Sequence, residues 1–181
     1  MKVIQVSDKI IVIENFFSDE ECQKYIDLSE NLGYEVANID TGKIVLEVRN
    51  NERVFYKSED LAQEIYGRAK PHLPSKIGNS QLCGLNELFR FYKYQKGHRF
   101  KGHQDGNFIR NETEASYLTF MIYLNEGYEG GHTIFREHNI TPKKGMALIF
   151  HHKLYHEGDE VLSGIKYVLR SDVMYQLEIK M

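Results

Sequence analysis

The chain has 181 residues, enough for one domain with a buried core. It is 41% hydrophobic and 27% charged, and its net charge of −3 with no long basic run argues against a general binder of nucleic acids or membrane surfaces. No apolar run approaches the roughly 18–20 residues of a membrane-spanning helix, and charges interrupt the first residues too early for a signal peptide.

The chain contains two cysteines, Cys22 and Cys83, and no Cys-x-x-Cys pair. Two cysteines without a pattern indicate reduced, buried thiols in a cytoplasmic protein, and we assign them no catalytic role.

The N-terminal part of the chain predicts two short strands followed by a helix. The strands are expected at residues 3–6 and 9–13, which are rich in β-branched residues. Ser18 and Glu21 form a capping-box pattern, and the helix that follows is expected to end at Gly33.

A second helix is expected to begin at Ser58 and to end at Pro71. The stretch before it, residues 42–56, favours strand but is interrupted by a charged, loop-like segment at residues 49–53. This segment carries Arg49 and Arg53, which would either contact an acidic group of a substrate, cover the active site as a lid, or lie as solvated charges on a hairpin.

From residue 81 onward the pattern changes to strands and turns. The expected strands are residues 89–94, 117–124, 133–135, 146–150, 166–169 and 173–177. Helices followed by many short antiparallel strands predict an α+β fold with a sandwich or jelly-roll core buttressed by N-terminal helices. We expect a single domain, with residues 1–80 as a helical and β support region and residues 81–181 as the core.

The stretch Tyr94-Gln-Lys-Gly-His-Arg-Phe-Lys-Gly-His103-Gln-Asp105 carries the main candidate for chemistry. If it forms a strand, His103 and Asp105 point to the same face. Two histidines and one carboxylate form the facial triad of non-haem Fe(II) oxygenases. His156 is the preferred third ligand, although His151 and His152 lie near it in the sequence.

Further motifs follow this stretch in a fixed order. They are Tyr123-Leu124-Asn125, Gly130-Gly131-x-Thr133-x-Phe135, Pro142-x-x-Gly145-x-Ala147-Leu148-x-Phe150, His156-x-Gly158 and Gly164-x-Lys166. Together with the Tyr94–Asp105 stretch, this order resembles the prolyl 4-hydroxylase-like branch of the Fe(II)- and 2-oxoglutarate-dependent dioxygenases. The resemblance covers residues 89–175, roughly half of the chain, and implies a double-stranded β-helix core.

The resemblance implies a role for each matched residue. His103, Asp105 and His156 would hold Fe(II), and Lys166, ten residues after His156, would pair with the far carboxylate of 2-oxoglutarate. Tyr94 and Tyr123 would contact or enclose this co-substrate.

Strand periodicity adds candidates to this pocket. Thr119 and Met121 share a strand face with Tyr123 and are expected to line the pocket with it. Arg170 shares a face with Lys166, and its planar guanidinium is an alternative partner for the carboxylate, so the choice between the two cations stays open.

The implied reaction hydroxylates an unactivated C–H bond and converts 2-oxoglutarate and O2 to succinate and CO2, with ascorbate as a candidate reductant. By resemblance the substrate is a prolyl or other residue of a protein or peptide; the alternative is a free amino acid or natural product. Arg49, Arg53 and Arg90 are the candidate substrate-binding residues, although Arg90 could instead pair with a structural Asp or Glu. A rival of another class is a non-catalytic barrel that binds a metal or ligand, and neither nucleic acid nor a membrane is expected as a partner.

Overall fold

The computed structural model describes residues 1–37 and 50–178. Two α-helices lie in the first part of the chain, α1 (Asp19–Leu32) and α2 (Glu59–Ala69), and a short 3-10 helix, η1 (Lys70–His72), follows the second. No helix among the described residues is long and apolar enough to cross a membrane.

Most of the remaining elements belong to one large antiparallel sheet. Its strands are β1 (Lys2–Ser7), β2 (Ile10–Glu14), β3 (Glu35–Val36), β4 (Glu52–Lys57), β5 (Lys76–Ile77), β6 (Ser80–Leu85), β7 (Leu88–Tyr94), β9 (Glu114–Tyr123), β13 (Ala147–His151) and β16 (Lys166–Leu177). The main path through this sheet is β1-β2-β13-β9-β16-β7-β4-β3, and β6 pairs with the C-terminal half of β16.

Two smaller sheets complete the fold. The four-stranded sheet runs β12-β11-β14-β8 and contains β8 (Phe100–His103), β11 (Thr133–Phe135), β12 (Asn139–Ile140) and β14 (His156–Gly158). A two-stranded sheet pairs β10 (Glu129–Gly130) with β15 (Val161–Ser163). From β7 to β16 the chain passes repeatedly between the large sheet and the four-stranded sheet, so strands far apart in sequence are brought together.

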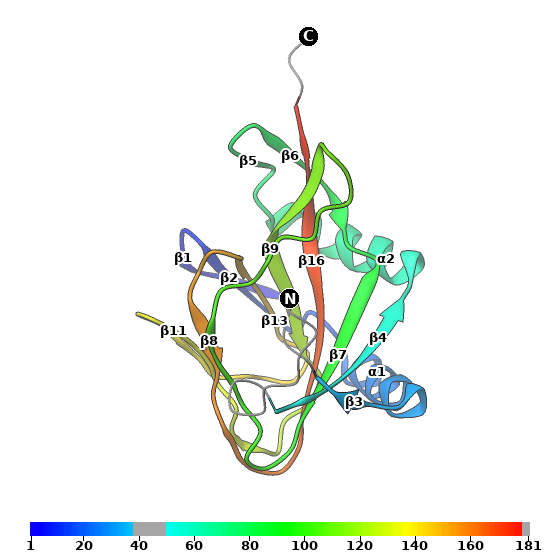
Figure 1. The fold of residues 1–181 in the computed structure, drawn as a ribbon, viewed down its shortest axis with the longest axis vertical. Coiled ribbons are helices and arrows are strands. Elements are labelled where there is room, and N and C mark those ends of the chain that lie inside the picture. Colours follow the sequence, from blue (N-terminus) through cyan, green and yellow to red (C-terminus); the bar gives the residue numbers. More distant parts are fainter. Residues whose placement is uncertain (38–49, 179–181) are drawn as a thin grey trace.

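The large sheet has apolar side chains on both faces. On one face, Phe120 and Ile122 of β9 pack in the same cluster as Tyr25 of α1 and Ile65 of α2. On the other face, Tyr123 of β9 and Phe150 of β13 pack in one cluster with Phe135 of the four-stranded sheet. Figure 1 shows this arrangement, with α1 and α2 on one side of the large sheet and β8 and β11 on the other. Burial on both faces explains why the central strands are nearly continuous runs of apolar residues.

Both predicted helix starts are confirmed. The hydroxyl of Ser18 accepts a hydrogen bond from the backbone N–H of Glu21, whose side chain binds the backbone of Ser18 in return. Helix α1 ends before Gly33, which has φ +82°. Ser58 caps α2 by accepting a hydrogen bond from the backbone N–H of Leu61.

Three local predictions are wrong. The expected strands at 166–169 and 173–177 are one strand, β16, because the polar residues between them are buried and paired across the sheet. Arg53 lies in strand β4 and not in a loop, whereas Arg49 falls outside the described residues. Strand β8 ends at His103, so Asp105 lies in the segment after the strand.

Candidate metal centre and active site

Strand pairing brings the two candidate histidine ligands together. His103 ends β8 and His156 begins β14, and the two residues lie directly opposite each other in the antiparallel pair. The Cβ atoms of such cross-strand partners are about 4.5–5.5 Å apart, and the two imidazole rings here have centroids 4.4 Å apart. The separation of 53 positions (156 − 103) between the histidines in sequence is therefore no obstacle to their forming one site.

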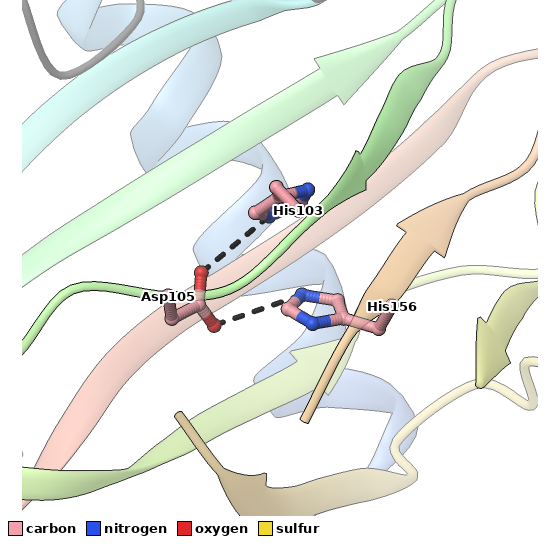
Figure 2. A group of neighbouring side chains, drawn as sticks. All are labelled: His103, Asp105 and His156. Carbon is pink, nitrogen blue, oxygen red and sulfur yellow. Dashed lines mark ion pairs between the residues drawn. The ribbon is translucent and has the colours of Figure 1, made fainter. Parts of the chain in front are cut away.

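Asp105 completes the cluster from the segment after β8. Its backbone N–H donates to the carbonyl of His152 at 3.0 Å, which holds the segment in place without strand pairing. Its Oδ1 lies 3.5 Å from Nε2 of His103 and its Oδ2 lies 3.7 Å from Nε2 of His156 (Figure 2). Potential ligand atoms of the three residues lie within 4.8 Å of one another.

Hydrogen bonds determine which ring nitrogen of each histidine is available to bind a metal ion. Nδ1 of His103 lies 2.8 Å from the carbonyl oxygen of Lys101, and Nδ1 of His156 lies 2.9 Å from that of Leu154. A carbonyl oxygen can only accept, so each Nδ1 carries a proton, and each Nε2 is the ring nitrogen that faces Asp105. Such an outer hydrogen bond is typical of metal-binding histidines.

The charge state of these groups also suits a metal ion. Burial lowers the pKa of His156 to about 4, so its imidazole is neutral near pH 7. Burial alone would raise the pKa of Asp105, but the guanidinium of Arg170 and hydrogen bonds from neighbours hold that pKa well below its usual range. Two imidazoles and one carboxylate on one side of a space are the donor set of a 2-His-1-carboxylate iron site. The residues present therefore fit Fe(II).

A buried chain of hydrogen bonds orients the carboxylate. The hydroxyl of Thr119 donates to Oδ2 of Asp105 and lies 2.9 Å from Nδ1 of His152. Because the single hydroxyl proton is used on Asp105, Nδ1 of His152 is the donor to Thr119. Nε2 of His152 then accepts from the hydroxyl of Ser116 at 2.8 Å, and that hydroxyl accepts from the backbone N–H of Phe108.

Arg170 is positioned by two buried carboxylates. Its Nη1 lies 3.1 Å from Oδ1 of Asp105, and its Nη2 lies 3.5 Å from Oδ1 of Asp172. Asp172 is 1% exposed and also pairs with Arg90 at 3.0 Å. The two predicted candidates Arg170 and Arg90 thus share a structural carboxylate.

Lys166 is a buried residue of strand β16. It is 2% exposed, and it stands opposite Tyr94 in the pairing of β16 with β7. Its Nζ donates to the carbonyl of Gly131 at 2.5 Å and lies 5.1 Å from the ring centroid of Tyr94 and 5.4 Å from that of Tyr123. Burial lowers the pKa of Lys166 to about 7, and a bound carboxylate would restore its charge.

A narrow cavity extends from Lys166 to the metal cluster. Its walls include Tyr92, Tyr94, Phe100, Thr119, Met121, Thr133, Phe150, Val168 and Arg170, as well as the three candidate ligands. Tyr123 is completely buried behind this wall, with its hydroxyl 2.6 Å from that of Thr133. Of the predicted pocket residues, Tyr94, Thr119, Met121, Lys166 and Arg170 line the cavity, whereas Tyr123 supports it from behind.

A second cavity lies next to the candidate ligands His103 and Asp105. Arg53, Arg90 and Arg170 contribute to its walls, and its volume is about 220 Å³. The structure therefore brings two of the three predicted substrate-binding arginines to one place, and the third, Arg49, lies outside the described residues.

The sequence analysis did not name Ser116 or Asp172, quoted Thr133 only as part of a motif, and considered His152 only as an alternative metal ligand. Each is buried, and each makes a polar contact inside the sheets. Of these residues, only Asp172 could have been predicted from the sequence. It lies two positions after Arg170, and residues two apart on a strand point to the same face.

Comparison with known proteins agrees with this site. A family model described as the 2OG-Fe(II) oxygenase superfamily matches residues 89–171. The chain is 26% identical over 202 residues to prolyl 4-hydroxylase 1 of Arabidopsis thaliana, and the match covers 92% of this chain and 69% of that protein.

Solved structures share the fold at low sequence identity. A viral collagen prolyl hydroxylase from Paramecium Bursaria Chlorella virus-1, in a 2OG complex, aligns with a TM-score of 0.69, 22% identity and coverage of 95% of this chain and 98% of that one. A prolyl hydroxylase from Trichoplax adhaerens, in complex with a hypoxia inducible factor peptide fragment, aligns with a TM-score of 0.71, 16% identity and coverage of 92% and 84%.

The family model, which matches a little less than half of the chain, and the relatives together support a 2OG-Fe(II) oxygenase of the prolyl hydroxylase-like branch. They indicate a 2-oxoglutarate-dependent hydroxylase with Fe(II) and 2-oxoglutarate as its cofactor and co-substrate. These assignments confirm the resemblance seen in the sequence.

Proposed function

We propose that the protein hydroxylates an unactivated C–H bond of a prolyl or other peptidyl residue, on a double-stranded β-helix core buttressed by its two N-terminal helices. The observation that carries this proposal is the convergence of His103, Asp105 and His156 between two cavities. One cavity ends at a buried lysine, as a dicarboxylate co-substrate requires, and the other is free for the substrate.

Fe(II) bound with 2-oxoglutarate and O2 supplies the oxidising power, and succinate and CO2 are the expected co-products. The two Nε2 atoms and the Asp105 carboxylate would hold the ion on one side and leave its remaining positions to the ligands. The ammonium of Lys166 would move from the carbonyl of Gly131 to the far carboxylate of 2-oxoglutarate, which offsets the cost of burying that carboxylate. Thr119 and Arg170 would hold the carboxylate of Asp105 in one orientation throughout.

The peptidyl substrate is favoured by the relatives. The Arabidopsis protein is named a prolyl 4-hydroxylase, and the Trichoplax structure contains a peptide fragment. The second candidate, a free amino acid or small organic acid, is favoured by the limited size of the arginine-lined cavity, about 220 Å³.

The test is an anaerobic titration of the metal-free protein with Fe(II) and then 2-oxoglutarate, while the visible charge-transfer absorption of a chelated keto acid is followed. The absorption should saturate in the wild type and should be absent in His103→Ala. Lys166→Ala should require far more 2-oxoglutarate, because the carboxylate then lacks its cation.

Lys57→Ala serves as the matched control, since Lys57 is exposed at the end of β4 and lines neither cavity. If the wild type binds Fe(II) but develops no absorption with 2-oxoglutarate, the hydroxylase function is wrong. The protein would then be a non-catalytic barrel that binds a metal.

A further inference from the structure

One buried imidazole joins the metal cluster to the wall of the second cavity. His152 is 1% exposed, and its ring nitrogens lie 2.9 Å from Oγ1 of Thr119 and 2.8 Å from Oγ of Ser116. Thr119 donates to the candidate ligand Asp105, and Ser116 accepts from the backbone N–H of Phe108, which lines the second cavity. We call the chain of side chains Asp105-Thr119-His152-Ser116 the His152 relay.

The hydrogen bonds of the His152 relay all run in one direction. The hydroxyl proton of Thr119 is used on Asp105, so Nδ1 of His152 donates to Thr119 and Nε2 accepts from the hydroxyl of Ser116. The oxygen of Ser116 in turn accepts from the backbone N–H of Phe108. Every donor thus points toward the carboxylate of Asp105, and hydrogen bonds in such a chain polarise and strengthen one another. Loss of one link therefore weakens the bonds that remain.

The relay also closes the segment from Asp105 to Phe108 into a loop. The backbone N–H of Asp105 donates to the carbonyl of His152 at 3.0 Å, and the backbone N–H of Ser116 donates to the carbonyl of Phe108 at 2.8 Å. The residues between Asp105 and Phe108 line the second cavity as well. Phe108 therefore cannot move away from Ser116 without breaking the chain of bonds that ends at Asp105.

We infer that His152 is a positioning residue through which the wall of the second cavity and the orientation of Asp105 are coupled. This inference rests on the metal site of the proposed function and adds a residue that lines neither cavity. Such a coupling is reciprocal. A metal ion that holds Asp105 also holds Phe108, and a substrate that rests against Phe108 raises the affinity for the metal.

Two substitutions cut the relay at different links. Asparagine at position 152 can place its amide nitrogen where Nδ1 lies, so His152→Asn keeps the donor to Thr119 and loses the acceptor for Ser116. Glutamine is one methylene longer and can place its amide oxygen where Nε2 lies, so His152→Gln keeps the acceptor for Ser116 and loses the donor to Thr119. His151→Asn and His151→Gln are the matched controls, since His151 is the preceding residue and lines neither cavity.

The experiment uses the full chain and Zn(II), which is redox-inert. Calorimetric titration measures the affinity for Zn(II). Hydrogen exchange of the backbone N–H of Phe108, followed by NMR with and without the ion, measures how often its bond to Ser116 opens. In the wild type Zn(II) should slow this exchange, because opening at Phe108 disturbs the orientation of Asp105 to which the ion binds.

The two variants at position 152 should separate these measurements. His152→Gln should lower the affinity for Zn(II) by about 10–100-fold, the usual effect of losing an outer partner of a ligand, and should leave exchange at Phe108 in the metal-free protein unchanged. His152→Asn should keep an affinity close to that of the wild type, but exchange at Phe108 should become faster and insensitive to Zn(II). Both His151 variants should behave like the wild type.

Three results would overturn the inference: exchange at Phe108 that does not respond to Zn(II) in the wild type, a response that persists in His152→Asn, or equal affinities in the two His152 variants. A persistent response would mean that the backbone between Asp105 and Phe108 carries the coupling. None of these results alters the expected absorption with Fe(II) and 2-oxoglutarate in the wild type. A failure of the hydroxylase function and a failure of this inference can therefore be told apart.

Discussion

The guanidinium of Arg170 lies 3.1 Å from Oδ1 of Asp105, which pairs a predicted co-substrate anchor with a candidate metal ligand. This pairing leaves Lys166 as the better placed cation for the far carboxylate of 2-oxoglutarate, since Lys166 donates to a backbone carbonyl and forms no ion pair with the described residues. It also means that Arg170 stabilises the protein before any metal binds.

Arg170→Met should therefore lower the stability of the metal-free protein. The change leaves the buried carboxylate of Asp105 without its cation, and breaking a buried pair in this way costs roughly 3–5 kcal/mol. Urea unfolding in the presence of a chelator measures the loss. Lys143→Gln is the control, because Lys143 pairs with Glu14 at an exposed position and the loss of this pair should cost far less stability. Equal losses in the two variants would contradict a structural role for the Arg170–Asp105 pair.

Thr119→Val should weaken metal binding. Valine keeps the shape of threonine but removes the hydroxyl that donates to Asp105 and accepts from His152. Loss of such an outer partner typically lowers metal affinity by about 10–100-fold, which calorimetric titration with Zn(II) can measure. Thr119→Ser keeps the hydroxyl and should restore most of the affinity; wild-type affinity in Thr119→Val would show that the contact does not orient the ligand.

Lys166→Met should make the protein more stable at neutral pH while abolishing the tight binding of 2-oxoglutarate. Burial lowers the pKa of Lys166 from 10.5 to about 7, so between these values the unfolded chain binds a proton that the folded chain does not. The stability of the wild type therefore rises with pH in this window, and its deficit relative to the variant is largest at pH 7 and below. The difference should be roughly 2–5 kcal/mol near pH 7 and should shrink toward pH 10.

Thermal or urea unfolding of the wild type and Lys166→Met at several pH values between 7 and 10 measures this difference. Both proteins are measured without 2-oxoglutarate, and the subtraction removes contributions from groups that they share. A difference that stays constant across the window would show that Lys166 is charged in the folded protein.

Gly145→Ala should destabilise the fold at the junction between the start of β13 and the segment before α1. Gly145 has φ +72°, its carbonyl accepts hydrogen bonds from the N–H groups of Phe16 and Phe17, and an added Cβ would lie 2.3 Å from the carbonyl oxygen of Phe17. The loss should be about 2 kcal/mol or more, since both the conformation and the contact disfavour alanine.

Gly67→Ala is the matched control for that substitution. Gly67 lies in helix α2, and a Cβ added there would contact nothing within 4 Å. This variant should gain roughly 0.5–1 kcal/mol, because alanine is the better helix former. Opposite signs for the two variants in urea unfolding are the expected result, and a stabilised Gly145→Ala would contradict the close approach to Phe17.

The convergence of the three candidate metal ligands could be predicted from the sequence because their signal is local. His103 and Asp105 lie two residues apart, and His156 precedes Lys166 by ten residues in a recognisable order. The prediction that His103 and Asp105 share a strand face was wrong, however. Asp105 is held by a hydrogen bond to the backbone of His152 and lies after the end of the strand.

The rest of the site depends on sheet register, which the sequence does not display. Ser116 and His152 are 36 residues apart and meet only because β9 pairs with β13 and the chain continues past it. Strand β16 appeared as two strands because Arg170, Ser171 and Asp172 resemble a polar turn. In the structure Arg170 and Asp172 form ion pairs inside the sheet and Ser171 donates to the carbonyl of Asn86, so the strand continues through them.

Among the described residues, the four-stranded sheet and the segments next to it supply all three candidate metal ligands, whereas the large sheet supplies the lysine and the arginines that line the two cavities. The candidate ligands and the cationic side chains thus come from separate layers of the molecule. A substitution in one layer would change the charge on one wall of a cavity and leave the opposite wall in place.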